Sequence, residues 1–264
     1  HALAHWQANE AGFLQQPGNT EYLHQLRVGI RRLRVACGTL AQAAGWHAAA
    51  LQPVRESLRT LGQQLGAARD WDVFIEETWP PLAGQLNDMS LRQSLAEAAA
   101  RLRDTARVQA QAALGERACQ RALLQLGRCL ASHDDAAPVA FDALDEELDR
   151  LAGRLREAQP HLERLSAARQ HRLRITAKKL RYLTEFIASR YEGTATEPWL
   201  EWLRHAQTVL GARNDRVTAQ ARVDLLCDTL AAKASATRKA LHSALHDQAA
   251  PRLDLPPLPK PYWR

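Results

Sequence analysis

Runs of β-branched residues are nearly absent from the 264-residue chain, and aromatic residues make up only 6% of it. Strands are built mainly from these residue types, so the sequence offers little material for a sheet. Alanine, leucine, arginine and glutamine dominate instead, and all four favour helices. An apolar content of 46% is enough for a sizeable core. The composition therefore predicts an all-α globular protein.

Long apolar runs are missing as well. No stretch comes near the roughly 20 apolar residues that a membrane-spanning helix needs. The start of the chain also lacks the basic segment followed by an apolar one that marks a secretion signal. We therefore expect a cytoplasmic protein with no membrane partner. The sequence begins with His1 rather than methionine, so we expect a processed product or a piece of a longer protein.

Paired cysteines are a third absence. The four cysteines, Cys37, Cys119, Cys129 and Cys227, stand far apart, with no CxxC pair. No histidine lies at a spacing from them that is typical of a zinc site. The pattern predicts buried free thiols in a reducing compartment, and we expect neither a metal nor another cofactor.

Acidic residues are absent from two stretches, although the net charge of the whole chain is only +6. No acid lies between Glu21 and Glu56, where the charge is +5, and none lies between Glu163 and Glu185, where it is +7. Together the two stretches carry +12, so the rest of the chain sums to −6. The positive charge forms two local fields, which favour an anionic ligand.

These two stretches are copies of one motif. HQLRVGIRRLR at 24–34 matches HRLRITAKKLR at 171–181 at an offset of 147, and each basic position of the first recurs in the second. Further along, LGAARD at 65–70 matches LGARND at 210–215 at an offset of 145, and Arg59 matches Arg204. Such self-similarity predicts an internal duplication.

The spacing of the basic residues predicts a cationic helix face. At about 100° per residue, His24, Arg27, Arg31 and Arg34 fall in one narrow stripe. The opposite face is apolar in both copies and suited to burial. Its residues are Leu26, Ile30, Leu33, Cys37 and Leu40 in the first copy, and Leu173, Ala177, Leu180, Thr184 and Ile187 in the second.

A row of like charges on one helix face is unfavourable unless an anion meets it, because such neighbours repel by a few tenths of a kcal/mol per pair. Each row rises about 15 Å along its helix, which suits a repeated phosphate chain better than one phosphate group. Arginine binds phosphate oxygens through paired hydrogen bonds, and lysine adds a point charge. A merely solvated charged face is the alternative, and the exact recurrence of the row argues against it.

At these residues the sequence resembles the conserved histidine α-helical domain (CHAD) family. The similarity rests on HQLRVGIRRLR at 24–34, LGAARDWDV at 65–73, HRLRITAKKLRY at 171–182 and LGARND at 210–215, and it covers nearly the whole chain. It implies two four-helix bundles related by a pseudo-two-fold axis, with a basic groove or pore that binds inorganic polyphosphate. Members occur alone or fused to a CYTH-type triphosphatase domain, and some associate with polyphosphate granules.

The resemblance also implies which residues bind the polyanion. They are His24, Arg27, Arg31, Arg32 and Arg34 in the first copy, and His171, Arg174, Lys178, Lys179 and Arg181 in the second, with Arg59 and Arg204 as weaker candidates. Arg32 and Lys179 lie off the main stripe, so each either flanks the ligand or contacts a neighbouring helix. Lysine replaces arginine at 178 and 179, which softens bidentate contacts there.

Three aspartates and four tryptophans have simpler interpretations. Asp70, Asp72 and Asp215 follow Leu-Gly segments that we interpret as turns. We favour helix capping or pairing with arginine for these aspartates over metal binding. The tryptophans at 71, 79, 199 and 202 are not interleaved with the basic rows, and we expect them in the core or between helices.

Helix-breaking residues divide the chain. Ser132 to Pro138 predicts the junction between a first half, 1–132, and a second half, 139–250. The Gly193–Pro198 break matches the Gly45–Pro53 region between paired helices. The proline-rich tail, 251–264, is expected to be extended and to fold back through Tyr262 and Trp263.

Two other functions compete with non-catalytic polyphosphate binding. Nucleic-acid binding uses the same electrostatics, but the rows lack the aromatic platforms and base-reading side chains that usually accompany it. Hydrolysis of phosphoanhydride bonds normally needs a metal held by carboxylates, which neither row contains. The sequence therefore predicts a binding module rather than an enzyme.

Overall fold

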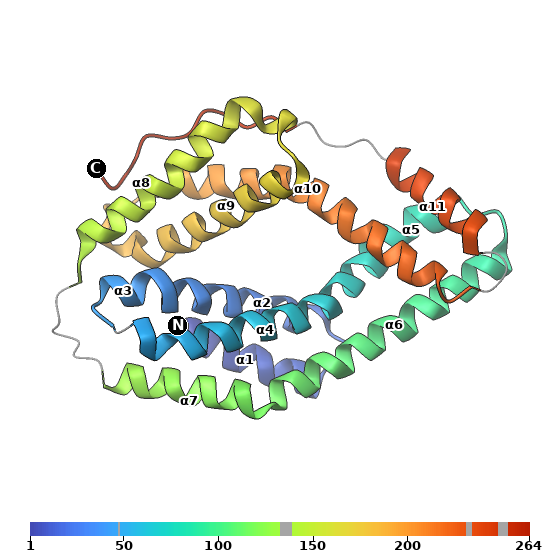
Figure 1. Ribbon diagram of the computed structural model, residues 1–264, viewed down its shortest axis with the longest axis horizontal. Coiled ribbons are helices and arrows are strands. Elements are labelled where there is room, and N and C mark those ends of the chain that lie inside the picture. The colour runs from blue at the N-terminus through green and yellow to red at the C-terminus, as the bar shows by residue number, and fades with distance from the viewer. Residues whose placement is uncertain (47, 133–138, 231–233, 248–252) are drawn as a thin grey trace. The chain divides into compact units, whose positions relative to one another are not determined.

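The computed structural model describes residues 1–46, 48–132, 139–230, 234–247 and 253–264, and over these residues it contains helices and no strand (Figure 1). The first elements are α1 (Ala2–Gln15), α2 (Thr20–Val35), η1 (Ala36–Leu40), α3 (Ala41–Ala43), α4 (Ala48–Val73), η2 (Phe74–Thr78), α5 (Trp79–Ala83), α6 (Met89–Gly115) and α7 (Arg117–Ala131). The remaining elements are α8 (Phe141–Ala158), η3 (Gln159–Arg164), α9 (Ala167–Ile187), η4 (Ala188–Arg190), α10 (Glu197–Cys227) and α11 (Ala234–Asp247). The all-α prediction is confirmed.

The chain forms two compact units, and each unit takes segments from both halves of the sequence. Unit 1 comprises His1–Leu33, Pro53–Gly127 and Arg216–Ala249. Unit 2 comprises Arg34–Gln52, Arg128–Asp215 and Ala250–Arg264. The predicted halves, 1–132 and 139–250, describe the sequence repeat and do not coincide with these units. Most of the predicted junction, 133–138, lies outside the described residues.

The two basic helices bury the faces that the sequence pattern predicts. On α2 and η1, Leu26, Ile30, Leu33 and Cys37 are buried, and Leu40 is half-buried. On α9, all five predicted residues, Leu173, Ala177, Leu180, Thr184 and Ile187, are buried. The apolar stripe of each helix therefore holds it in the core, which leaves the cationic stripe on the other side.

Glycine allows the chain to turn at the two predicted breaks. Gly45 follows α3 with a φ of 74°, and Gly193 follows η4 with a φ of 42°. Side chains are strained in this left-handed region, so glycine is favoured at both places. The breaks are confirmed, although Pro53 lies inside α4, in its second turn, and Pro198 lies in the first turn of α10.

Buried tryptophans contribute to the core of each unit, as predicted. Trp71 and Trp79 are almost fully buried in unit 1, and Trp199 and Trp202 in unit 2. Trp199 contacts Trp202 with ring centroids 6.2 Å apart. All four cysteines were predicted to be buried free thiols: all four are free, and Cys37, Cys119 and Cys227 are buried, but Cys129 is only half-buried. None of the described helices is long and apolar enough to cross a membrane.

The C-terminal tail folds back onto unit 2 in an extended form, as predicted. The Trp202 indole nitrogen donates to the Pro256 carbonyl at 2.7 Å, and that of Trp199 donates to the Lys260 carbonyl at 2.8 Å. Tyr262 Oη donates to Thr184 Oγ1 on α9 at 2.9 Å. An extended proline-rich segment has no internal hydrogen bonds, so indole donors from α10 pair with its carbonyls.

Trp263 anchors the end of this tail. Its ring is buried and lies 5.1 Å, centroid to centroid, from that of Trp199. Its indole nitrogen donates to Asp149 Oδ1 on α8 at 2.9 Å. Hydrogen bonds from Arg264 and Trp263 hold the pKa of Asp149 below its ordinary value, although its slight burial acts in the other direction.

We predict that Trp263→Ala lowers the free energy of unfolding by about 3 to 5 kcal/mol, because it leaves a cavity and removes the indole donor to Asp149 Oδ1. Urea unfolding followed by circular dichroism measures the change. Lys260→Ala is the control, since the Lys260 residue is exposed and its backbone carbonyl, which the substitution keeps, accepts from Trp199, and its stability should match that of the wild type. Equal stability of all three proteins would contradict the role of Trp263.

Candidate functional site

Each predicted basic row lies on one helix. On α2, His24, Arg27, Arg31 and Arg32 are half-buried, and Arg34 is exposed. On α9, His171 is exposed, and Arg174, Lys178, Lys179 and Arg181 are half-buried. The first row belongs to unit 1 apart from Arg34, and the second belongs to unit 2. A groove shared by the two rows therefore stays a prediction.

Arg27 connects the first row to α4. Its Nη1 atom donates to the Gly62 carbonyl at 2.9 Å, and its guanidinium lies over Gly66. A Cβ atom on residue 66 would come within 2.7 Å of Nη1, closer than real contacts allow. The absence of a side chain at Gly66 therefore creates the space that holds Arg27.

The same arrangement recurs in unit 2. Arg174 lies over Gly211 of α10, where a Cβ atom would be 3.5 Å from Nη2 and 3.6 Å from Nε. Its Nη2 atom also contacts Asp215 Oδ1 at 3.4 Å, a long ion pair. Arg27 and Arg174 are equivalent in the repeat, as are Gly66 and Gly211. Within each unit, the basic motif and the Leu-Gly motif thus form the two sides of one contact between helices.

The interpretation of the Leu-Gly segments as turns is wrong. Residues 65–70 lie inside α4, and residues 210–215 lie inside α10. A glycine within a helix usually marks a position where another group approaches closely, and here that group is an arginine side chain. The pattern had suggested turns because glycine is common at both kinds of position.

A second pair of residues faces across each helix contact. His171 Nδ1 lies 2.7 Å from Asn214 Oδ1, one helical turn from the Arg174–Gly211 contact. The equivalent residues in unit 1 are His24 and Arg69, one turn from Arg27 and Gly66. One turn toward the N-terminus of α2 therefore corresponds to one turn toward the C-terminus of α4, as expected of antiparallel helices. In unit 2 the imidazole contacts an amide, and in unit 1 the guanidinium of Arg69 is close enough to lower the pKa of the His24 imidazole.

The surroundings of His24 favour its neutral form. Burial is the largest cause that lowers its pKa from 6.5, and the positive charge of Arg69 is the next. Arg31 and Arg27 lower the pKa further, whereas Glu21 acts to raise it. Four cationic or potentially cationic groups of unit 1 are therefore close enough to influence one another. Such a cluster is stabilised by an anion.

Carboxylates from outside the acid-free stretch approach part of the second row. Lys179 Nζ lies 2.6 Å from Glu147 Oε1 of α8, which confirms that this off-stripe residue contacts a neighbouring helix. Arg181 Nε lies 3.5 Å from Glu185 Oε1, one turn further along α9. Burial acts to raise the pKa of Glu147, but hydrogen bonds from Arg150 and Lys179 outweigh it and hold that pKa low. The second row, whose own stretch of sequence contains no acid, is therefore partly neutralised by carboxylates from other parts of the chain.

The weaker candidates occupy matching positions. Arg59 and Arg204 are exposed on α4 and α10, each seven residues before the glycine that receives an arginine. Seven residues are close to two helical turns, so each arginine lies on the same side of its helix as that glycine. Both extend the basic surface beside a row.

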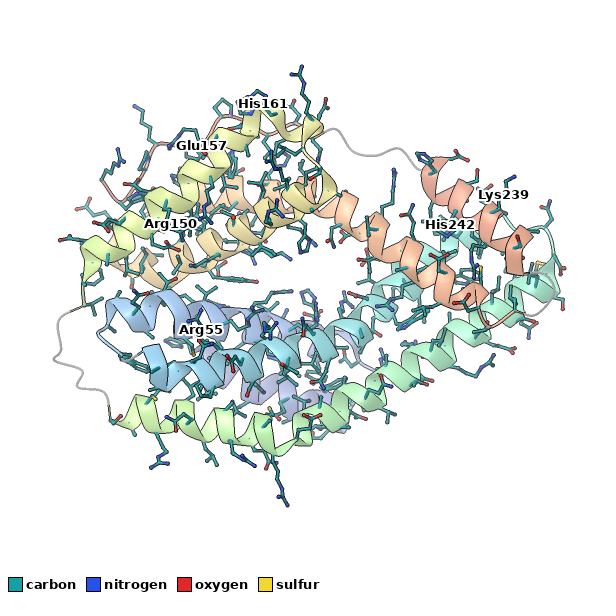
Figure 2. All side chains as sticks on the ribbon, viewed as in Figure 1. Arg55, Arg150, Glu157, His161, Lys239 and His242 are labelled. Atoms are coloured by element: carbon teal, nitrogen blue, oxygen red, sulfur yellow. The ribbon has the colours of Figure 1, made fainter. Side chains whose placement is uncertain are left out.

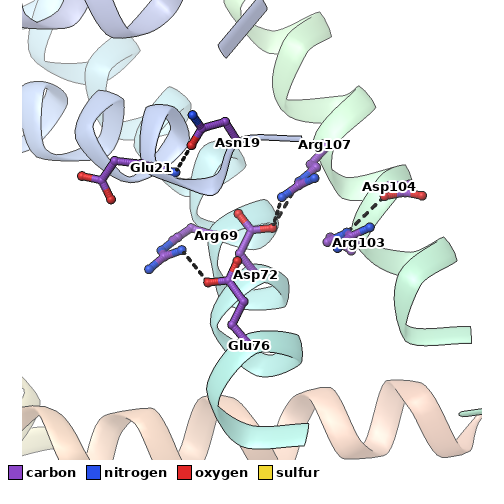
Figure 3. A network of polar contacts seen from close by, with 8 residues as sticks. All are labelled: Asn19, Glu21, Arg69, Asp72, Glu76, Arg103, Asp104 and Arg107. Carbon is purple, nitrogen blue, oxygen red and sulfur yellow. Dashed lines mark hydrogen bonds and ion pairs between the residues drawn. The ribbon is translucent and has the colours of Figure 1, made fainter. Parts of the chain in front are cut away.

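The aspartates pair with arginines rather than cap helices. Asp72 Oδ1 accepts from Arg107 Nη2 of α6 at 2.6 Å, with both side chains buried (Figure 3). Asp70 lies 3.3 Å from Arg222 Nη2, so the capping interpretation of Asp70 is wrong because α4 continues through it. Burial raises the pKa of Asp72, and Arg107 acts against this. These two pairs connect helices of unit 1, and none of their residues belongs to a basic row.

Arg69 is the site residue that the motif comparison overlooked. It stands three residues after Gly66 within the LGAARD motif, and Asn214 replaces it in the second copy. That mismatch between two otherwise similar motifs was the available signal. Its importance depends on the packing of α4 against α2, which the spacing within one helix does not reveal.

The comparisons with known proteins concern the family and the fold. The family model described as CHAD domain matches residues 1–224. The crystal structure of the CHAD domain from the plant Ricinus communis is similar, with a TM-score of 0.76 and 28% sequence identity. The similarity covers 95% of this chain and 90% of that one. No curated protein matches the chain.

We predict that Gly66→Ala displaces the guanidinium of Arg27 and breaks its hydrogen bond to Gly62. Stability should stay within about 1 kcal/mol of the wild type, because alanine favours a helix over glycine by about that amount. A crystal structure and a thermal unfolding curve of the variant test this. In the control, Gly211→Ala, the new methyl meets only ordinary contacts at 3.5 Å, and Arg174 should stay in place. An unmoved Arg27 in Gly66→Ala would show that the glycine is not required.

Proposed function

Because the chain belongs to the CHAD domain family, we propose that it binds inorganic polyphosphate on its two basic rows without catalysing a reaction. The observation that carries the proposal is the repeated contact in which Arg27 lies over Gly66 and Arg174 over Gly211. Each arginine is held by a neighbouring helix, so less side-chain freedom is lost when it binds an anion.

The shape of each row favours a polymer over a single phosphate. Its cations follow one another along about 15 Å of helix, and the exposed Arg59 and Arg204 extend the charge. Successive phosphates of a chain can each meet one cation, and guanidinium groups bind their oxygens in pairs. The charge of the ligand also removes the repulsion between neighbouring cations.

The carboxylates beside the rows do not support hydrolysis. Asp215 contacts Arg174, and Glu147 contacts Lys179 and Arg150. Each is thus engaged by cations, whereas phosphoryl transfer typically uses carboxylates to hold a metal. Aromatic platforms for bases are also missing from the described parts of the rows, since Trp71, Trp199 and Trp202 are buried.

The proposal includes the arrangement that the resemblance implies. It comprises two four-helix bundles related by a pseudo-two-fold axis, with the rows along one basic groove. The cellular context would be cytoplasmic, either at polyphosphate granules or beside a fused or associated CYTH-type triphosphatase. Binding would then serve targeting, sensing or storage of polyphosphate.

We predict that alanine at Arg27, Arg31, Arg174 and Lys178 together weakens polyphosphate binding at least about a hundredfold, because four charged contacts to phosphate are lost. Fluorescence anisotropy with labelled long-chain polyphosphate measures the affinity. The dependence of affinity on salt should also become shallower, since fewer counterions are released.

A matched control removes the same charge elsewhere. Alanine at Arg101, Arg117, Arg121 and Arg128, which are exposed on α6 and α7, should leave binding within a few-fold of the wild type. Equal losses in both quadruple variants would mean that net charge alone attracts the polymer. Tighter binding of DNA or RNA at equal phosphate concentration would favour the nucleic-acid alternative.

We also predict that polyphosphate binding takes up a proton at His24. Its pKa lies below 6.5 in the free protein because of burial, Arg69, Arg31 and Arg27, against Glu21, so His24 is neutral at pH 7.5. A polyanion on the row favours the charged form, so affinity should rise as the pH falls, by at most about tenfold per unit for one proton.

Affinity measured between pH 5.5 and 7.5 tests this linkage. His24→Gln should flatten the pH dependence, because the titrating group is gone. His161→Gln, on the exposed η3 turn of unit 2 and labelled in Figure 2, is the control and should keep the wild-type slope. If the slopes of wild type and His24→Gln agree, His24 does not take up the proton.

A further inference from the structure

A hydrogen bond from α10 orients His171 of the second row. Its Nδ1 atom lies 2.7 Å from Oδ1 of Asn214, a length typical of an N–H···O hydrogen bond. The oxygen of a side-chain amide only accepts, so Nδ1 carries the hydrogen. The contact therefore selects one of the two neutral forms of the imidazole, the form with its hydrogen on Nδ1.

The other ring nitrogen of His171 is left for a ligand. His171 is exposed, and within the parts of the chain that the structure describes Nε2 has no hydrogen-bond partner. Nδ1 and Nε2 lie on different edges of the ring, so a ring held against α10 through Nδ1 directs Nε2 away from that helix. A ligand on the row therefore meets His171 through Nε2.

The packing of α9 against α10 places Asn214 beside this histidine. One turn away, Arg174 lies over Gly211. Asn214 follows Gly211 by three residues and His171 precedes Arg174 by three, so the two pairs share one side of each helix. The histidine and its acceptor are thus aligned before any ligand arrives.

The matched position of unit 1 cannot select a tautomer in this way. Asn214 corresponds to Arg69, and a guanidinium has N–H donors and no acceptor. Arg69 therefore cannot receive a hydrogen from Nδ1 of His24. Control of the histidine through this position belongs to unit 2.

The selected form decides how His171 can meet a phosphate. With the hydrogen on Nδ1, Nε2 of the neutral ring carries a lone pair, which repels a phosphate oxygen. Nε2 donates to that oxygen only after it gains a proton. Charged neighbours among the described side chains are Arg174, one turn along α9, and Asp215, next to Asn214, and these two pair with each other at 3.4 Å.

We infer that Asn214 is a positioning residue of the second row. It holds the His171 ring with the hydrogen on Nδ1, so that Nε2 is the nitrogen that takes up a proton and donates to a bound phosphate. The inference rests on the proposed function, because it assigns a contact within the same site. His171 then adds to the proton uptake of His24 and does not replace it.

The tautomer is tested on the full chain without a ligand. Long-range proton–nitrogen correlation spectra at alkaline pH, where imidazoles are neutral, separate a ring nitrogen that carries a hydrogen from one with a lone pair. His171 should show the hydrogen on Nδ1, and Asn214→Ala should shift it toward Nε2. Asn214→Asp keeps an acceptor oxygen at residue 214 and should restore the Nδ1 form. His24 should not respond to either change.

The effect on the ligand is measured by anisotropy with labelled polyphosphate at about pH 5.5, below the ordinary pKa of a histidine. Asn214→Ala should weaken binding about two- to tenfold, the range expected for one hydrogen bond. In the background of His171→Ala the same substitution should have no further effect, because Asn214 acts through His171. Gln220→Ala, which removes a half-buried amide elsewhere on α10, is the control and should leave affinity unchanged.

The outcomes separate the inference from the function on which it rests. A hydrogen on Nε2 in the wild type would mean that the Asn214 amide donates instead, and the inference would be wrong. Equal losses from Asn214→Ala with and without the His171 side chain would give Asn214 a structural role only, which also contradicts it. If the wild type binds no polyphosphate, the proposed function fails and the inferred phosphate contact fails with it, even where the spectra show the Nδ1 form.

Discussion

An arginine guanidinium packed over a helical glycine determines the geometry of each row. Arg27 fits over Gly66 only because that residue has no side chain, and its hydrogen bond to Gly62 fixes it there. The contact sets the distance and register between α2 and α4, and these in turn decide which residues lie beside His24. The same contact in unit 2 sets the position of Asn214 beside His171. In each unit, the position of this arginine therefore determines which polar side chain lies beside the histidine.

Burial and charge are separated on the two basic helices. The apolar faces of α2 and α9 are buried in the cores of their units. This burial fixes the helices and keeps the cations on the opposite faces, outside the cores. Repulsion along the rows is a cost that the free protein tolerates because the cores supply the stability. Charges that do lie in the interior are neutralised by close pairing, as Arg107 is by Asp72. Cations next to solvent are therefore the ones that remain responsive to a ligand.

Because the motifs recur, the differences between their two copies are informative. Both copies keep a histidine, an arginine over glycine and a buried apolar face, whereas the surrounding charges have diverged. Glu147 of α8 binds Lys179, and Asn214 stands where the first copy has Arg69. The tail adds a further asymmetry within unit 2. It contacts α8 through Trp263 and α9 through Tyr262, and its carbonyls accept from Trp199 and Trp202 of α10.

Composition was enough to predict the all-α class. Periodicity along one helix was enough to predict the buried faces of α2 and α9 and the cationic stripes, because each is a local property of a 3.6-residue repeat. Contacts between helices decided the rest. The Leu-Gly segments lie within helices and contact Arg27 and Arg174 rather than forming turns. Asp70 pairs with Arg222 instead of capping a helix, and Lys179 pairs with Glu147. These partners are separated by tens of residues in the sequence, so their proximity follows from packing rather than from spacing. Arg69 belongs with them, since only the register of α4 against α2 brings it to His24.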